Sequence, residues 1–330
     1  MTTLWDTTGT AVVKALSAER RMAGSVSSGL ALTLVVVVAE KDVGDAEQAA
    51  TRAAAEHPCR LLIVVRRRPD APEPRLDAEV LIGDRLGPGE AVVMRMYGRL
   101  ALHAESVVLP LLAPDTPVVT WWFGAPPDLV AHDPLGVFAD RRVTDCTLAE
   151  DPRAALQVRA QDYAPGDTDL CWTRTTAWRA LCASAFDSVD DRPTQARVVG
   201  AAGDPTCALL AGWLHRRLGI DVERAEGGDR GVSAVEFTLP TGELKISVAD
   251  ARTAVLSRPG VPDRTMPLSP RAVGDLLAEE LRRLDPDETY AEALEAATGE
   301  KGLSRRSRTR THQWHDPVES DSPDPALTTS

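Results

Sequence analysis

A run of seven residues near the N-terminus, Leu32–Val38 (LTLVVVV), constrains the fold more than any other segment. Four consecutive valines favour a β-strand, and the lack of polar alternation predicts that side chains cover both faces of this strand. An alanine-rich stretch that opens at Asp45 predicts a helix ending before His57-Pro58, and Leu61–Val65 predicts a second buried strand. Strand, helix and strand within about forty residues form a βαβ unit, in which a right-handed crossover joins two parallel strands.

The remaining sequence predicts an α/β protein in two parts, followed by a tail. At roughly 150 residues per domain, 330 residues correspond to about two domains. We expect an N-terminal α/β domain with a mixed or parallel sheet at residues 1–150, and a second α/β domain of α+β character at residues 151–299. Residues 301–310 hold five basic side chains and residues 311–330 hold four acidic ones, with few apolar residues between them. We therefore expect residues 300–330 to form a disordered tail.

Charge and cysteine content exclude several classes of protein. Lysine and arginine number 37 against 49 acidic residues, and the resulting net charge of −12 repels phosphate backbones and anionic lipid. We expect neither nucleic acid nor a membrane as a partner, since the longest apolar run is far shorter than the ~20 residues of a membrane span. The five scattered cysteines form no CxxC pair, which argues against a zinc site or a disulfide framework and fits a reducing cytoplasm.

Searches for catalytic motifs find no strong candidate. The sequence has no Walker A motif, no GxGxxG after a strand and no GxSxG elbow. Gly200–Asp204 lies between a predicted strand and a predicted helix, where a phosphate-binding loop would lie. Asp204 already places a carboxylate at the helix start, however, so a tight turn is the favoured interpretation. A pair of carboxylates that acts as general acid and general base stays an open alternative, because 49 acidic residues offer too many pairs to select one. We expect no catalytic residues, no cofactor and no metal. The lack of a catalytic motif favours a binding or regulatory protein.

Tryptophan and arginine gather in two parts of the chain and suggest an interface. Both residue types are enriched at the energetic centres of protein interfaces. Our candidates for a surface that contacts a partner are Trp121, Trp122, Arg141, Arg142, Trp172 and Arg174. The alternative is a seam between the two domains, in which the indoles pack between the halves and the arginines pair with aspartates, because burial is the commonest fate of large aromatic residues.

Several segments resemble the OpcA family, the glucose-6-phosphate dehydrogenase assembly proteins of actinobacterial type. The segments that carry the resemblance are LTLVVVV (32–38), HPCR (57–60), GPGEAVV (87–93), HAESVVLPLLAPDTPVVTWW (103–122), APGDTDLCWTRTTAWRALCA (164–183) and LDPDETYAEAL (284–294). The resemblance implies a cytoplasmic, non-catalytic protein that binds glucose-6-phosphate dehydrogenase. The resemblance further implies an assembly or allosteric factor of the oxidative pentose phosphate pathway. Such a factor would bind the active oligomer of the dehydrogenase more tightly than the inactive form and thereby promote the active oligomer.

Two other classes of function stay open at this point. A seam between two α/β halves is a usual location for a ligand site, so the chain could be a sugar-phosphate-binding protein or a lactonase-like enzyme of the same pathway. Any of the five cysteines could also make the protein a thiol sensor.

Overall fold

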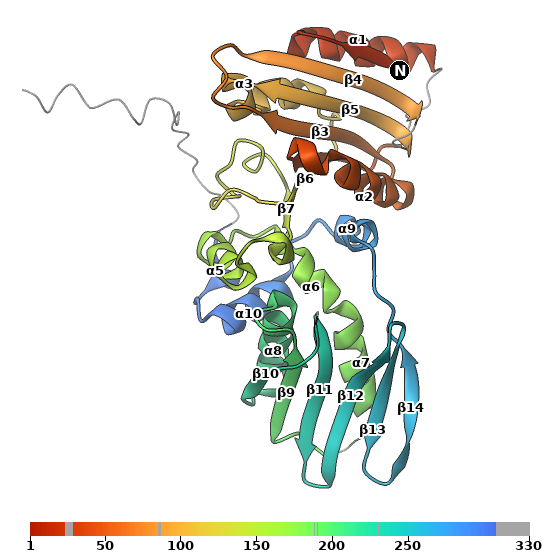
Figure 1. The fold of residues 1–330 in the computed structure, drawn as a ribbon, viewed down its shortest axis with the longest axis vertical. Coiled ribbons are helices and arrows are strands. Elements are labelled where there is room, and N and C mark those ends of the chain that lie inside the picture. Colours follow the sequence, from red (N-terminus) through yellow and green to blue (C-terminus); the bar gives the residue numbers. More distant parts are fainter. Residues whose placement is uncertain (24–28, 85–86, 188, 190, 230, 308–330) are drawn as a thin grey trace, which may run out of the picture.

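The computed structural model describes residues 1–307 apart from residues 24–28, 85–86, 188, 190 and 230, and the structural statements below concern those residues. Two sheets follow one another along the long axis of the molecule, with helices on and between them (Figure 1). The expected mixed α/β class is confirmed. Within this described part, no helix has both the length and the apolar character needed to cross a bilayer.

The first sheet has eight strands and is parallel through its centre. In spatial order its strands are β1 (Thr2–Leu4), β4 (Arg75–Asp84), β5 (Gly87–Tyr97), β3 (Cys59–Arg67), β2 (Leu32–Val38), β6 (Val118–Phe123), β7 (Arg141–Thr144) and β8 (Asp167–Asp169). The predicted βαβ unit is confirmed, because β2 pairs with β3 in parallel from Leu32–Cys59 to Val38–Val65. Strands β3 and β5, β2 and β6, β6 and β7, and β7 and β8 are also parallel.

Ten α-helices and four short 3-10 turns are assigned in the described residues. The α-helices are α1 (Gly9–Met22), α2 (Val43–Glu56), α3 (Arg99–Leu102), α4 (Glu105–Val108), α5 (Pro152–Asp162), α6 (Leu170–Arg174), α7 (Thr176–Phe186), α8 (Pro205–Leu218), α9 (Val273–Leu281) and α10 (Glu288–Thr298). The 3-10 turns are η1 (Glu40–Asp42), η2 (Leu109–Leu111), η3 (Cys146–Leu148) and η4 (Leu303–Arg305).

Helices cover both faces of the first sheet, as the uninterrupted valines predict. Alternate residues of a strand point to opposite faces, so Leu34 and Val36 pack on the side of α2 and α9. Val35 and Val37 pack on the other side, which is covered by residues of α1, α3 and α4. All seven residues of β2 are buried.

Helix α9 returns from the C-terminal part of the chain to complete this core. The alanine-rich surface of α2 lets α9 approach closely, and a Cβ placed on Gly274 would lie 2.7 Å from the backbone oxygen of Ala49. Leu276, Leu277 and Leu281 of α9 belong to the same apolar cluster as β2 and α2. This apolar cluster therefore contains side chains from both halves of the molecule.

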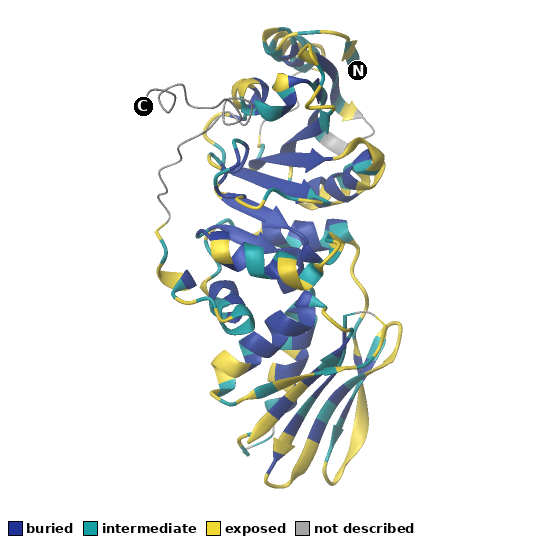
Figure 2. Cartoon of the chain, turned by 60° about the vertical axis from the view of Figure 1, so that its left-hand side comes forward, coloured by how far each residue is buried: buried dark blue, intermediate teal, exposed yellow. Residues whose placement is uncertain are grey.

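The second sheet has six strands and is covered on one face only. In spatial order its strands are β10 (Val222–Glu226), β9 (Gln195–Gly200), β11 (Val232–Leu239), β12 (Gly242–Asp250), β13 (Thr253–Arg258) and β14 (Val261–Pro267). Strands β9 and β10 are parallel and joined by α8, whereas β11 to β14 form an antiparallel meander. Helices α7 and α8 cover one face, and Figure 2 shows exposed and half-buried residues alternating with buried ones along the strands.

The first sheet extends further along the chain than the domain boundary expected at residue 150. Strand β8, which follows residue 150, belongs to the first sheet, and α9 packs on that sheet as well. The division at residue 150 therefore stays a prediction, while the first sheet itself extends to Asp169.

The chain is folded beyond residue 300, where a tail was expected. Leu303 is completely buried, and the Arg306 guanidinium donates to the backbone oxygens of Ala160, Gln161 and Tyr163. Over residues 300–307 the expectation of disorder is corrected, because one leucine and one arginine anchor the segment to the end of α5. Residues 308–330 lie outside the described residues.

Candidate functional site: the seam between the two sheets and its hollows

The two adjacent tryptophans of β6 lie on opposite faces of the first sheet. Trp121 is completely buried on the face covered by α2 and α9, with its ring edge-on to Phe123 at 5.3 Å between centroids. Trp122 is buried on the other face, beneath the β6–β7 connection, where its ring lies 3.3 Å from a Cβ built on Gly136. The strand alternation that separates the two indoles also prevents them from forming one surface.

Both arginines of β7 are buried, and each forms an ion pair with a carboxylate of another element. Arg141 pairs with Glu280 of α9 and donates to the Asp285 backbone oxygen at 3.0 Å, so it ties the first sheet to the C-terminal part of the chain. Arg142 pairs with Asp167 of β8 and donates to the Ala139 backbone oxygen at 2.7 Å. A buried charge is tolerable only with such partners, and both guanidinium groups are held accordingly.

Trp172 and Arg174 of α6 lie in the same seam. The Trp172 indole nitrogen donates to Asp287 at 2.8 Å, and the Arg179 guanidinium stacks on its ring at 3.8 Å from the centroid. Arg174 forms a two-pronged pair with Asp145, at 2.8 and 2.7 Å. Burial opposes the charge of Arg174, but the hydrogen bonds to Asp145 outweigh this effect and raise its pKa.

All six candidate interface residues thus lie inside the chain or pair across the seam. Arg174 has the most accessible side chain of the six, at 26% exposure, and the other five are at least nine-tenths buried. Arg141 and Trp172 bond to the C-terminal part of the chain, as expected of a seam, whereas Trp121 and Trp122 pack in the core of the first sheet. A role of these residues in contacting a partner stays a prediction.

Asp145, Asp169 and Cys171 form a buried group whose atoms lie within 4.8 Å of one another. The Asp145 carboxylate already accepts from Arg174 and from Thr147. The Asp169 carboxylate accepts from the backbone nitrogens of Cys146 and Cys171. Protein donors therefore satisfy these oxygens, and the arrangement is that of a structural hydrogen-bond cluster that ends β8 and begins α6.

The five cysteines are all free and buried. Burial raises the pKa of Cys59, Cys182 and Cys207 to about 12. For Cys146 and Cys171 burial also raises the pKa, and the nearby Asp169 carboxylate adds to the effect. Because the thiolate is the reactive form, this environment works against the thiol-sensor alternative.

Two hollows flank the loop that precedes α8. This loop is the Gly200–Asp204 turn. Asp204 caps α8 by accepting from the backbone nitrogen of Thr206 at 2.7 Å, and it also accepts from the backbone nitrogen of Gly231 at 3.1 Å. The large hollow, about 730 Å³, lies on the side of Trp178 and Leu268. The small hollow, about 290 Å³, lies between α5, β10 and the end of α10.

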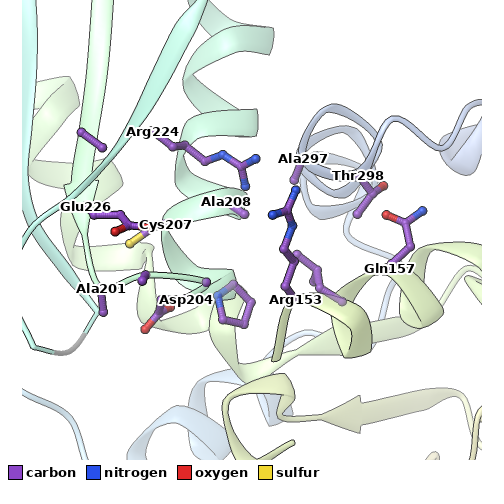
Figure 3. A pocket seen from close by; sticks show the side chains of 15 residues that line it. Arg153, Gln157, Ala201, Asp204, Cys207, Ala208, Arg224, Glu226, Ala297 and Thr298 are labelled. Carbon is purple, nitrogen blue, oxygen red and sulfur yellow. The ribbon is translucent and has the colours of Figure 1, made fainter. Parts of the chain in front are cut away.

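Polar side chains from two elements enter the small hollow. Arg153 and Gln157 come from α5 and Arg224 comes from β10, and Figure 3 shows the two guanidinium groups reaching toward the same space beside Ala208. Our sequence analysis missed these residues. Positions 153 and 157 lie one helical turn apart on α5, which is a signal that the sequence offers. No local pattern indicated β10, so nothing in the sequence pointed to Arg224.

The fold and the seam define the class of protein: two α/β halves, each with its own sheet, joined by a shared core and by buried ion pairs. Comparison with known families is consistent with this division. The "Glucose-6-phosphate dehydrogenase subunit N-terminal domain" model of the OpcA family matches residues 50–161, and its C-terminal domain model matches residues 165–294. The chain belongs to the OpcA family.

A curated relative and several solved structures are also similar. The "Putative OxPP cycle protein OpcA" of Synechococcus elongatus is 30% identical over 210 residues, which is 60% of this chain and 44% of that protein, so the match spans less than half of the relative. Among solved structures, an oxidoreductase from Sinorhizobium meliloti matches with a TM-score of 0.46 at 12% identity, covering 81% of this chain and 95% of that one. A Gfo/Idh/MocA family oxidoreductase from Vibrio cholerae covers the same shares with a TM-score of 0.38 at 10% identity. At these values neither structure informs the function.

Proposed function

We propose that the chain is a non-catalytic factor that binds glucose-6-phosphate dehydrogenase and promotes its active oligomer in the oxidative pentose phosphate pathway. The observation that carries the proposal is the pair of OpcA family models, which together cover both halves of the chain and name a subunit of that dehydrogenase. The name of the Synechococcus elongatus relative places that protein in the same pathway.

The geometry supports a role in binding. Glu280, Asp285 and Asp287 of the C-terminal half hold Arg141 and Trp172, and α9 completes the core of the first sheet. These contacts join the two halves of the chain, which suits a protein that stabilises one arrangement of a partner. A tenfold preference for the active assembly corresponds to about 1.4 kcal/mol per binding event.

The test is reconstitution with the cognate dehydrogenase. We expect the two purified proteins to co-elute in gel filtration, the dehydrogenase activity to rise when the chain is added, and the chain alone to show no dehydrogenase activity. A dehydrogenase that is fully active alone and unchanged on addition of the chain would contradict the proposal. Hydrolysis of a sugar-phosphate lactone by the chain alone would favour the lactonase-like alternative instead.

Trp172→Ala serves as a matched control in the same experiment. Because Trp172 is buried in the seam, this change should reduce activation only as far as it reduces the folded fraction. A full loss of binding with an unchanged melting temperature would return Trp172 to the interface.

A further inference from the structure

The small hollow beside α8 contains positive charge that no acidic group among the described residues pairs with. In the part of the chain that the structure describes, neither Arg153 nor Arg224 takes part in an ion pair, and the Gln157 amide has no hydrogen-bond partner. The seam arginines Arg141, Arg142 and Arg174 each have a carboxylate partner. The two arginines of the hollow differ from these neighbours in being unpaired.

The arrangement of the two arginines matches an anion that lies between them. They approach from separate elements, α5 and β10, and Figure 3 shows both side chains reaching into the hollow rather than away from it. Two guanidinium groups repel one another when nothing lies between them. Their forked donors match the oxygens of a phosphate group, which one arginine can bind through two parallel hydrogen bonds.

The carboxylates at the hollow leave this space free. Asp204 is engaged as the cap of α8, and Glu226, which also lines the hollow, forms no ion pair with either arginine in the described residues. The start of α8 itself contributes no anion site, because Asp204 occupies it and Pro205 lacks an N–H group. The side chains of Arg153 and Arg224 are therefore the groups that would hold the ligand.

We propose that the small hollow binds a small phosphate monoester, with its phosphate between Arg153 and Arg224 and with the Gln157 amide bonding to a hydroxyl or carbonyl of the ester. The volume of about 290 Å³ lies near the lower end of the range for small-molecule sites, which fits a compact phosphorylated compound. The ligand would contact both halves of the chain, since Arg153 belongs to the segment matched by the N-terminal family model and Arg224 to that matched by the C-terminal one.

The experiment is a calorimetric titration of the isolated full-length chain with inorganic phosphate and with glycerol phosphate. We expect saturable binding of one molecule per chain, with glycerol phosphate the tighter ligand because it also meets Gln157. Arg153→Gln and Arg224→Gln should each weaken binding by about tenfold or more, since each removes charged hydrogen bonds. Both arginines are exposed, so the melting temperature should stay unchanged.

Two further variants make the test specific to this hollow. Arg197→Gln removes the same charge from an exposed arginine that pairs with Glu223 on the open face of the second sheet, and it should leave binding unchanged. Glu226→Gln removes a carboxylate from the hollow and should tighten binding. An equal loss in all three arginine variants, or no saturable binding at millimolar phosphate, would overturn the proposal. The measurement needs no dehydrogenase, so its outcome is independent of the function proposed above.

Discussion

The two sheets of this protein bury their side chains in different ways. Helices and loops cover the first sheet on both faces, and every residue of its central strand β2 is buried. The second sheet packs α7 and α8 against one face, and its other face carries ion pairs such as Lys245–Glu236, at 2.8 Å. Parallel sheets usually need cover on both sides, whereas antiparallel sheets tolerate water on one. Substitutions should therefore be costly on either face of the first sheet and on only one face of the second.

The largest effect is expected for Trp121→Ala in the first sheet. This side chain is completely buried, so its removal leaves a cavity and should lower the free energy of unfolding by about 3–5 kcal/mol. Urea denaturation followed by circular dichroism measures the change. Trp5→Ala is the matched control, because Trp5 is 69% exposed and its loss should cost less than about 0.5 kcal/mol. Equal effects of the two changes would contradict the assignment of Trp121 to the core.

A smaller effect is expected where the two halves are tied together. Glu280→Gln keeps the shape of the side chain but leaves Arg141, which is 3% exposed, without its carboxylate. We expect a loss of about 2 kcal/mol in the free energy of unfolding, since a buried charge then lacks its partner. The double change Arg141→Met with Glu280→Leu should recover most of this loss, because apolar groups can replace a buried pair. A double variant less stable than Glu280→Gln would contradict this expectation, because it would show that apolar side chains cannot replace the Arg141–Glu280 pair.

The smallest effect is expected on the open face of the second sheet. Lys245→Ala removes an ion pair to Glu236 whose lysine side chain is 42% exposed. Such exposed pairs contribute about 0–1 kcal/mol, and the change should be barely resolved in the same denaturation measurement. A loss comparable to that of Trp121→Ala would mean that this face is covered in the intact protein, for example by a partner or a second copy of the chain.

Local sequence patterns predicted the elements whose periodicity is strong. The βαβ unit at Leu32–Val65 was predicted because an uninterrupted run of valines indicates a strand that is buried on both faces. Thr175 separates α6 from α7, and its hydroxyl donates to the Trp172 backbone oxygen. Short strands such as β7 and β8 were missed, since three or four residues carry no measurable period.

The candidate site was harder to predict than the fold. The local excess of tryptophan and arginine drew attention to Trp121, Arg141 and Trp172, but composition could not distinguish a docking surface from a seam between the two halves. Their burial depends on α9 and α10, which lie more than a hundred residues further along the chain. Arg153 and Arg224 were missed for the same reason, because they line one hollow only once α5 and β10 pack beside α8.

The sequence by itself determined the α/β class and the doubly covered first sheet, since these follow from the spacing of apolar residues within single segments. The resemblance to the OpcA family was also recognisable from the sequence, because it rests on ordered local motifs. Only the tertiary structure decided which polar residues are paired and which are unpaired. Pairing depends on distances between segments far apart in the chain: Arg141 pairs with Glu280 because α9 returns to the first sheet, and Arg153 and Arg224 line one hollow in which, among the described residues, neither has an ion-pair partner.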